Sequence, residues 1–304
     1  MTILLLGADG QVGFELHRAL APIGRIVATT RTGLLPGGID CARCDLGDHA
    51  ALDALIETTR PNWIVNAAAY TAVDHAEAEP DLAHRINGDA LTVIGTAAKR
   101  VGSRVVHYST DYVFNGTATL PWREDASTAP LSAYGRSKLA GETALRESAA
   151  AHLIFRTAWV YGPRGTNFLR TMLRLARERE RLTVVADQIG TPTPARLIAQ
   201  TTALVLYALR NAANDDARFG TYHLTANGHT NWHGFASRII ELAHGSGLIE
   251  RKPEVVAITT AEFPTKAVRP AYSVLDTSKL QSTFGLALPD WTEGLARAMG
   301  ELNA

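Results

Sequence analysis

Gly7-Ala8-Asp9-Gly10-Gln11-Val12-Gly13 is the stretch of this 304-residue sequence that decides the fold. It follows the apolar run 2–6 and precedes an amphipathic stretch, so the pattern predicts a turn between a strand and a helix. In such a turn one glycine allows a tight bend, one lets a pyrophosphate approach the backbone, and one lets the helix pack closely on the strand. The unpaired N–H groups and the dipole at the start of the helix attract phosphate. We therefore expect a dinucleotide site that contains Gly7, Gly10 and Gly13.

The rest of the first half alternates short apolar runs with amphipathic stretches. The apolar runs are rich in Ile, Val and Leu without polar alternation, which is typical of strands buried on both faces. Strands that alternate with helices form right-handed βαβ crossovers and a parallel sheet. The expected fold class is α/β, a Rossmann-type doubly wound parallel sheet. We expect strands at 2–6, 25–29, 42–44, 62–66, 104–109 and 152–157, and helices at 11–20, 48–58, 82–100 and 132–149.

The alternation loosens after about residue 160. We expect further helices at 167–181, 195–209 and 232–244, and a strand at 221–224 that returns to the sheet. Residues 1–160 are assigned to a dinucleotide-binding domain, rejoined by about 195–226. Residues 161–194 and 227–304 are assigned to a smaller C-terminal lobe that binds the substrate. We expect this lobe at the C-terminal edge of the sheet, where ligands bind in open α/β folds.

The composition excludes several classes of protein. Lys+Arg and Asp+Glu both number 30, so the basic excess of a nucleic-acid-binding protein is missing and we expect no nucleic-acid partner. The first apolar run is too short for the core of a signal peptide. No run reaches the roughly 18 apolar residues that cross a bilayer. We therefore expect no membrane partner and a location in the cytoplasm.

Cys41 and Cys44 are the only cysteines and form a C-x-x-C pair. A zinc site needs two more ligands, and a thioredoxin-like motif needs to open a helix; neither context is present. We expect no metal here and no disulfide framework. A redox or zinc protein built on this pair is kept as one alternative, which predicts that alanine at both positions abolishes activity.

The end of the second expected strand indicates which cofactor is used. An acidic residue there would accept hydrogen bonds from a ribose 2′-hydroxyl and favour NAD. This sequence has Thr30-Arg31-Thr32 instead, and Arg31 could pair with a 2′-phosphate, helped by the hydroxyl of Thr30 or Thr32. We therefore expect NADPH, with NADH still possible. The alternative for Arg31 is a solvated cation in a loop.

Tyr134 and Lys138 are four residues apart at the start of an expected helix, which puts both on one helical face. A free phenol has a pKa near ~10. A lysine charge about 4 Å away would favour the phenolate by roughly 4 kcal/mol at an effective dielectric constant of about 20, which lowers the pKa by up to roughly three units. Such a phenol can protonate a carbonyl oxygen while hydride reaches the carbon. Y-x-x-x-K is common by chance, but here it follows Thr110 at the end of a central strand, where a hydroxyl can hold the substrate oxygen.

At this point the sequence resembles the extended short-chain dehydrogenase/reductase superfamily and, within it, the dTDP-4-dehydrorhamnose reductases. The segments that carry the resemblance span nearly the whole chain. They are 7–16 (GADGQVGFEL), 65–74 (VNAAAYTAVD), 107–115 (HYSTDYVFN), 133–142 (AYGRSKLAGE), 155–162 (FRTAWVYG), 187–194 (DQIGTPTP) and 288–294 (LPDWTEG).

The resemblance implies a reaction and a set of roles. The family reduces the C4 ketone of a dTDP-4-dehydro-6-deoxy sugar with NADPH or NADH. Tyr134 would donate the proton, Lys138 would bind the nicotinamide ribose and lower the tyrosine pKa, and Thr110 would hydrogen-bond the ketone oxygen. Gly10, Gln11 and Val12 would lie on the pyrophosphate, Asp45 and Leu46 beside the adenine, Ala69, Tyr70 and Thr71 along the cofactor, and Trp159 and Asp111 at the sugar.

Two further expectations concern the substrate and the assembly. Arg269 is a candidate partner for the substrate diphosphate, with a structural ion pair at least as likely. Some relatives bridge subunits through magnesium held by glutamates, and Glu15 matches one of these positions. Arg196 stands where another glutamate is expected, and its charge would repel the metal. We therefore expect no such magnesium site, which leaves the expected homodimer in doubt.

Other classes of enzyme and one non-catalytic class share parts of this pattern. A 4,6-dehydratase would need an Asp-Glu pair after Thr110, whereas Asp111-Tyr112 follows it here. Another sugar-nucleotide reductase or an epimerase of the same superfamily remains an alternative. So does a non-catalytic NADP-binding subunit of the type that regulates methionine adenosyltransferase, although intact Thr110, Tyr134 and Lys138 argue against it. NADPH oxidation on adding the keto sugar separates the two.

Overall fold

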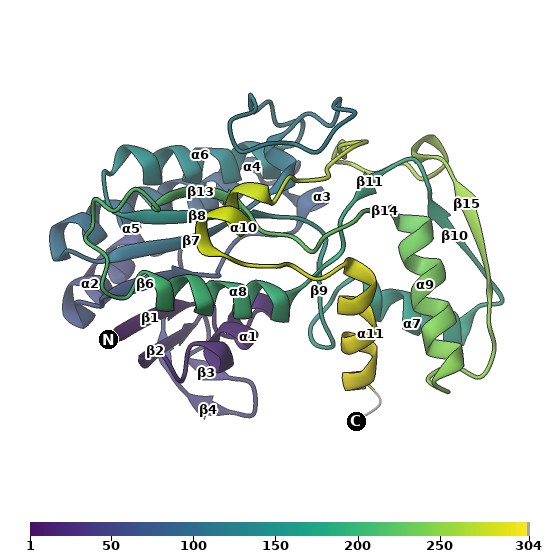
Figure 1. Ribbon diagram of the computed structural model, residues 1–304, viewed down its shortest axis with the longest axis horizontal. Helices are drawn as coiled ribbons and strands as arrows, with labels where there is room; N and C mark the ends of the chain where they lie inside the picture. The colour runs from purple at the N-terminus through teal and green to yellow at the C-terminus, as the bar shows by residue number, and fades with distance from the viewer. Residues whose placement is uncertain (303–304) are drawn as a thin grey trace.

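Seven parallel strands form the central sheet of the computed structural model, which describes residues 1–302 (Figure 1). Their order across the sheet is β13-β8-β7-β6-β1-β2-β5, and every neighbouring pair is parallel. The order reverses direction at β1, as expected for a doubly wound sheet. The strands are β1 (Thr2–Leu6), β2 (Arg25–Thr30), β5 (Ala42–Arg43), β6 (Trp63–Asn66), β7 (Arg104–Thr110), β8 (His152–Thr157) and β13 (Gly220–His223).

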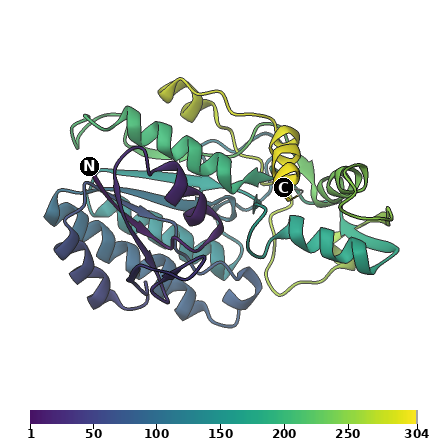
Figure 2. The same ribbon diagram turned by 90° about the horizontal axis from the view of Figure 1, so that it is seen from below.

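Helices cover both faces of this sheet (Figure 2). The strands are apolar without alternation because each face needs its own core. On β1, Ile3 and Leu5 pack in one buried cluster with α1 and α8, whereas Leu4 and Leu6 pack in another with the helices of the opposite face. The helices are α1 (Gln11–Ala19) and α8 (Ala195–Ala208) on one side, and α2 (His49–Thr59), α5 (Ala90–Val101) and α6 (Ala133–Glu147) on the other.

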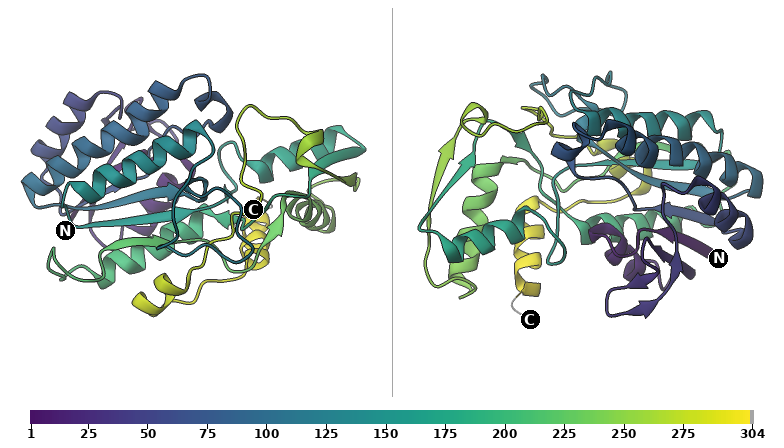
Figure 3. Two further views of the ribbon diagram at one scale, coloured as in Figure 1. Left: turned by 90° about the horizontal axis from the view of Figure 1, so that it is seen from above. Right: turned by 180° about the vertical axis from the view of Figure 1, so that it is seen from behind.

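The smaller lobe lies beside the C-terminal edge of the sheet (Figure 3). A separate buried cluster holds it together, built by α7, α9, α11 and the parallel pair β10 and β15. Short two-residue strands also pair within it, β11 with β14 and β12 with β9. Its elements are β9 (Val160–Tyr161), α7 (Phe168–Glu178), β10 (Arg181–Val185), β11 (Ile189–Gly190), β12 (Thr193–Pro194), β14 (Thr230–Asn231), α9 (Trp232–Gly245), β15 (Glu254–Ile258), a 3-10 turn (Thr260–Glu262) and α11 (Trp291–Leu302).

One part of the expected division differs from the structure. Helix α10 (Ser278–Phe284) lies in the stretch assigned to the smaller lobe, yet Leu280 and the following Leu288 pack in the core cluster of the sheet. The end of the chain therefore returns to the nucleotide-binding half before it forms α11. Residues 303–304 of the expected lobe lie outside the described part of the chain.

The long helix expected at 82–100 is present but contains a π-helical turn. The chain forms α3 (Val73–Ala76), α4 (Pro80–His84), a π-helical turn at Arg85–Asp89, and then α5. The wide turn places Asn87 so that its side chain bonds both backbone groups of Tyr70, and the Asn87 carbonyl lies against Gly141 of α6, where a Cβ would come within 2.1 Å. Packing against α6 thus accounts for the π-helical turn, which sequence periodicity does not reveal.

Several short elements were not expected. A hairpin of β3 (Leu34–Leu35) and β4 (Ile39–Asp40) follows β2, and a 3-10 turn (Asp111–Val113) follows β7. Two-residue strands and single turns carry too few residues for a periodic signal. Within residues 1–302, no helix combines the length and apolar character that crossing a membrane requires.

Candidate functional site

The glycine-rich turn between β1 and α1 is shaped by contacts that exclude side chains. Gly7 has a φ of 78°, and a Cβ there would lie 2.8 Å from Ala68. A Cβ on Gly13 would lie 1.9 Å from the Gly7 carbonyl oxygen, so helix and strand can approach only because Gly13 has none. Gly10 has ordinary room, 3.4 Å from the Gly7 oxygen, and it begins α1 without a side-chain cap. The chain itself thus requires two of the glycines, and the uncapped helix start at Gly10 is left open to a phosphate.

This turn opens into a cleft of about 650 Å³ at the C-terminal edge of the sheet. The cleft gathers side chains from β1, β2, β6, β7, α6 and the smaller lobe. Most of the residues predicted from the sequence line it: Gly7, Gly10, Gln11, Val12, Arg31, Asp45, Leu46, Ala69, Thr71, Thr110, Asp111, Tyr134, Lys138 and Trp159. The shape and lining suit a dinucleotide with its phosphates at the helix start.

Four predicted residues do not line the cleft. Gly13 lies behind the turn, where it acts through packing. Thr30 is fully buried, and its hydroxyl accepts hydrogen bonds from the N–H groups of Gly33 and Leu34. It caps its own loop, so the expectation that it helps bind a 2′-phosphate is wrong. The Tyr70 hydroxyl donates to Glu79 at 2.8 Å, outside the cleft.

Arg269 is the fourth. Its guanidinium donates to both carboxylate oxygens of Asp74, at 2.6 and 3.2 Å, and to the carbonyl of Ala267. The hydrogen bonds from Arg269 hold the pKa of Asp74 below its ordinary value. This is the structural ion pair that the sequence left open, and a diphosphate would have to compete with Asp74 for the guanidinium.

Tyr134 and Thr110 meet at the end of β7. Ser132 caps the start of α6 by accepting the Gly135 N–H, which fixes the first turn that carries Tyr134. Thr110 donates its hydroxyl to Asp111 at 2.9 Å. Burial first, and then the Asp111 carboxylate, raise the pKa of Tyr134 above its ordinary value.

The expected lowering of this pKa by Lys138 is therefore wrong for the enzyme without cofactor. The loss of water around the phenol raises its pKa, and the Lys138 Nζ is bonded to Tyr108 and His107 rather than to the phenol. Tyr134 stays protonated at neutral pH, which is the state that a proton donor needs.

Lys138 is almost fully buried, one helical turn after Tyr134. Its Nζ lies 2.6 Å from the Tyr108 carbonyl oxygen and 3.1 Å from Nε2 of His107. Burial lowers the pKa of Lys138 to about 7, because desolvation penalises the ammonium more than Glu142 stabilises it. The lysine is thus poised between its two forms near neutral pH.

We expect Lys138 to titrate near pH 7 in the enzyme without cofactor, far below an ordinary lysine. The chain has five lysines, so NMR of protein labelled with ¹³C-lysine resolves them individually. The resonance that disappears in Lys138→Met should be the one with the low midpoint. A Lys138 resonance that titrates above pH 9 would contradict this.

Two tryptophans form a flat apolar wall on the smaller-lobe side of the cleft. Trp159 has a φ of 46° and stacks on Trp232 with ring centroids 3.5 Å apart and nearly parallel planes. Gly190 lies against the Trp159 ring, where a Cβ would come within 2.5 Å. Trp159 was predicted from the sequence; Trp232 was not, because nothing in its local pattern separates it from a core residue.

Buried polar groups also line this cleft. The second carboxylate oxygen of Asp111 and the hydroxyl of Thr157 are buried without a hydrogen-bond partner. Burial raises the pKa of Asp111 to about 6. Such orphaned groups beside an apolar wall fit a ligand that carries hydroxyl and carbonyl groups.

The cysteine pair has the features of a structural element. Cys41 and Cys44 are free, and burial, followed by the nearby carboxylates of Asp45 and Asp48, raises the pKa of Cys44 to about 11. A reactive cysteine needs the opposite shift. In the described residues, no three potential ligands cluster as a metal site requires.

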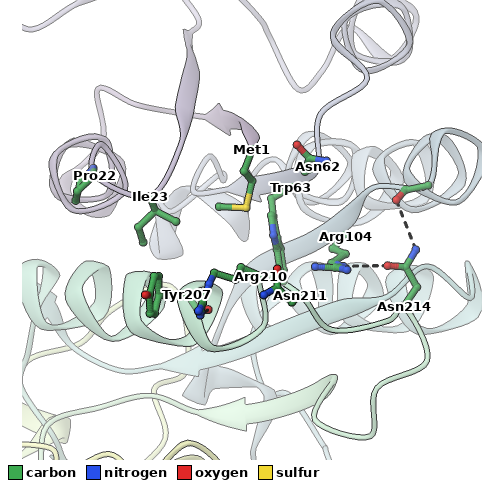
Figure 4. Close-up of a pocket in the computed structure, with 11 residues that line it drawn as sticks. Met1, Pro22, Ile23, Asn62, Trp63, Arg104, Tyr207, Arg210, Asn211 and Asn214 are labelled. Atoms are coloured by element: carbon green, nitrogen blue, oxygen red, sulfur yellow. Dashed lines mark hydrogen bonds between the residues drawn. The ribbon is translucent and has the colours of Figure 1, made fainter.

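A second hollow of about 410 Å³ lies at the opposite, N-terminal edge of the sheet (Figure 4). Arg104 points along it and donates to Asn214 Oδ1 and to the Leu209 carbonyl, both at 2.9 Å, and to the Ala212 carbonyl. These bonds tie β7 to the end of α8. Since the chain uses every nitrogen of this guanidinium, its role is structural.

Comparison with known proteins agrees with this geometry. A model of the family described as RmlD substrate binding domain matches residues 1–304. A dTDP-4-dehydrorhamnose reductase of Shigella flexneri is 48% identical over 99% of this chain and 98% of its own. The chain belongs to this family.

Other dTDP-4-dehydrorhamnose reductases extend the match. The Burkholderia thailandensis protein is 46% identical over 99% of each chain. A solved structure from Bacillus anthracis, in complex with NADP, is 35% identical with a TM-score of 0.85 and covers 99% of each chain. A UDP-glucose 4-epimerase from Thermus thermophilus has a TM-score of 0.81 at 19% identity, which shows the fold alone.

Proposed function

We propose that this protein reduces the C4 ketone of dTDP-4-dehydro-L-rhamnose to the alcohol of dTDP-L-rhamnose, with NADPH as the reductant. The observation that carries the proposal is the full-length match to dTDP-4-dehydrorhamnose reductases in a chain whose Thr110, Tyr134 and Lys138 line one cleft with the glycine-rich turn. NADPH, when bound, supplies the hydride that reaches C4.

The residues of the chain account for the rest of the reaction. The Tyr134 O–H bond breaks and its proton goes to the C4 oxygen, which gains the electron pair of the C=O bond as C4 accepts hydride. Thr110, whose hydroxyl donates to Asp111 in the structure, would turn it to that oxygen, and the raised pKa of Tyr134 keeps the proton in place until then. The stacked Trp159 and Trp232 offer the sugar an apolar face and exclude water from one side of it.

The test is a reduction assay with product identification. Purified protein, NADPH and dTDP-4-dehydro-L-rhamnose should give loss of NADPH absorbance and one equivalent of dTDP-L-rhamnose. Binding of NADPH without its oxidation would favour a non-catalytic subunit, and a C4 epimer of the product would favour another enzyme of the superfamily.

Arg31 is proposed to favour NADPH over NADH. It lines the cleft just after β2, where the 2′-phosphate of NADPH would lie, and Thr30 offers it no help. We expect Arg31→Gln to lower kcat/KM for NADPH by about 10- to 100-fold, since a hydrogen-bonded charge pair contributes roughly 1.5–3 kcal/mol. The value for NADH should change little. Arg43→Gln, an exposed arginine on β5 that does not line the cleft, is the matched control. Equal losses with both cofactors would remove Arg31 from this role.

The absence of a magnesium bridge is also proposed. Arg196 donates to Glu15 at 3.2 Å and also pairs with Glu301, so these carboxylates already have a cation. The homodimer and the cytoplasmic location stay predictions.

A further inference from the structure

Two buried side chains that the reaction above does not use connect Lys138 to the nucleotide turn. His107 of β7 lies 3.1 Å from the Lys138 Nζ through its Nε2, and its Nδ1 lies 3.2 Å from the side-chain nitrogen of Asn66 at the end of β6. His107 and Asn66 are each about 1% exposed. Each N–H that these buried side chains point at one another or at Lys138 therefore needs an acceptor there.

The orientation of the Asn66 side-chain amide determines the tautomer of His107. The Ala68 N–H donates to Asn66 Oδ1 at 3.2 Å, so the amide NH₂ of Asn66 faces His107. His107 Nδ1 must then accept. A neutral imidazole carries one N–H and one lone pair, so its proton sits on Nε2 and points at Lys138.

That proton decides the form of the lysine. An ammonium has three donors and no acceptor, so it would set N–H against the N–H of His107. A neutral amine accepts from His107 Nε2–H and still has two N–H bonds. One donates to the Tyr108 carbonyl at 2.6 Å, and the other is left for the cleft that Lys138 lines.

We propose that Asn66 and His107 are positioning residues that favour the neutral amine form of Lys138 in the enzyme without cofactor. The inference deepens the proposed function and rests on it for the role of Lys138. Charging the lysine requires His107 to move its proton to Nδ1 and Asn66 to rotate its amide, which breaks the bond from Ala68. Ala68 packs against Gly7 of the glycine-rich turn. The hydrogen bond from Ala68 to Asn66 therefore connects this turn to the protonation state of Lys138.

The other groups around Lys138 do not change this arrangement. Glu142, on the same helix, favours the ammonium but is itself paired with Arg156 of β8. Tyr108 of β7 and Tyr134 have raised pKa values and are uncharged near neutral pH. Burial, the largest cause, holds the pKa of His107 well below its ordinary value, and an ammonium on Lys138 would lower it further, so the imidazole is neutral with either form of the lysine.

The direct test is ¹⁵N NMR of histidine-labelled protein without cofactor at pH 8. The His107 ring, identified by its loss in His107→Gln, should show a protonated Nε2 and a bare Nδ1. The opposite tautomer or a doubly protonated ring overturns the proposal. The readout needs no turnover, so a failed reduction assay would remove the proposed function without changing this result.

Two variants then test the relay itself, with the Lys138 titration as the readout. Asn66→Asp can only accept, so it should draw the His107 proton to Nδ1 and raise the Lys138 midpoint by about one unit, tenfold in the acid constant. A raised midpoint with the proton still on Nε2 would be a plain charge effect and would count against the relay. His107→Gln should raise the midpoint without any change in net charge; no rise overturns the proposal. His152→Gln, whose imidazole meets only the Ala150 carbonyl among its hydrogen-bond partners, is the control and should leave Lys138 unchanged.

Discussion

Tyr134→Phe should lower kcat by about 10²–10⁴-fold, because it removes the group that protonates the C4 oxygen. The ring itself should stay in place. It packs edge-on against Tyr112 with centroids 5.7 Å apart, and phenylalanine keeps that contact. Cofactor affinity should therefore change little, and the loss should appear in kcat rather than in KM for NADPH.

The measurement is steady-state reduction of the keto sugar together with NADPH binding and thermal unfolding. Tyr207→Phe is the matched control: its side chain is 54% exposed on α8, and its hydroxyl lies far from the cleft. Near-normal turnover in Tyr134→Phe would falsify the proton-donor role. The unfolding and binding measurements show whether lost turnover reflects lost folding. A variant that is folded and binds NADPH normally but does not turn over supports the proton-donor role.

Glu142→Ala should lower the free energy of unfolding by about 3–5 kcal/mol, since removing one partner of a buried ion pair leaves a charge without compensation. Glu142 is 0% exposed and accepts from Arg156 Nε at 2.9 Å and Nη2 at 2.8 Å, with a further bond from Arg146. Arg156 is itself 3% exposed. Its guanidinium would stay buried in the variant.

At acidic pH, the free energies of unfolding of Glu142→Ala and of the parent protein should differ by less than at neutral pH. Burial alone would raise the pKa of Glu142, but the hydrogen bonds from Arg156 bring it below the ordinary 4.5. A depressed carboxyl pKa stabilises the fold above the ordinary value, and this contribution is lost as the pH falls through the folded-state value. Denaturant unfolding at neutral and at acidic pH measures both effects.

Glu178→Ala is the control for this experiment. Glu178 pairs with Arg174 at 3.0 Å on the exposed face of α7, half-exposed itself, so its loss should cost less than about 1 kcal/mol. If both variants lose the same stability, the burial of the Glu142 pair is not what makes it important.

The sequence allowed the nucleotide-binding half to be predicted because each of its signals is local. The strands are uninterrupted apolar runs, and the turn after β1 is recognisable from the spacing of Gly7, Gly10 and Gly13. The smaller lobe was harder, because β10, β15 and α11 are stabilised by one another in a shared cluster, and short strands give no period of their own. The π-helical turn before α5 packs on Gly141 of a different helix.

The site divides in the same way. Tyr134, Lys138 and Thr110 were predictable from spacing and order, and the cleft contains all three. The direction of their pKa shifts could not be predicted, because it depends on burial. Burial raises the pKa of Tyr134 and lowers that of Lys138. His107 and Asn66 belong to no recognisable sequence motif, and only the register of β6 against β7 makes them neighbours.

The order of the elements along the chain limits how early this protein can fold during translation. Because α8, β13 and Leu288 complete the half that starts at residue 1, that half cannot finish folding until nearly the whole chain has left the ribosome. Translation stopped near residue 160 should yield an incomplete, aggregation-prone intermediate instead of a nucleotide-binding module. Neither half can be cut out as one continuous fragment, so shuffling lobes between relatives would demand several splice points at once.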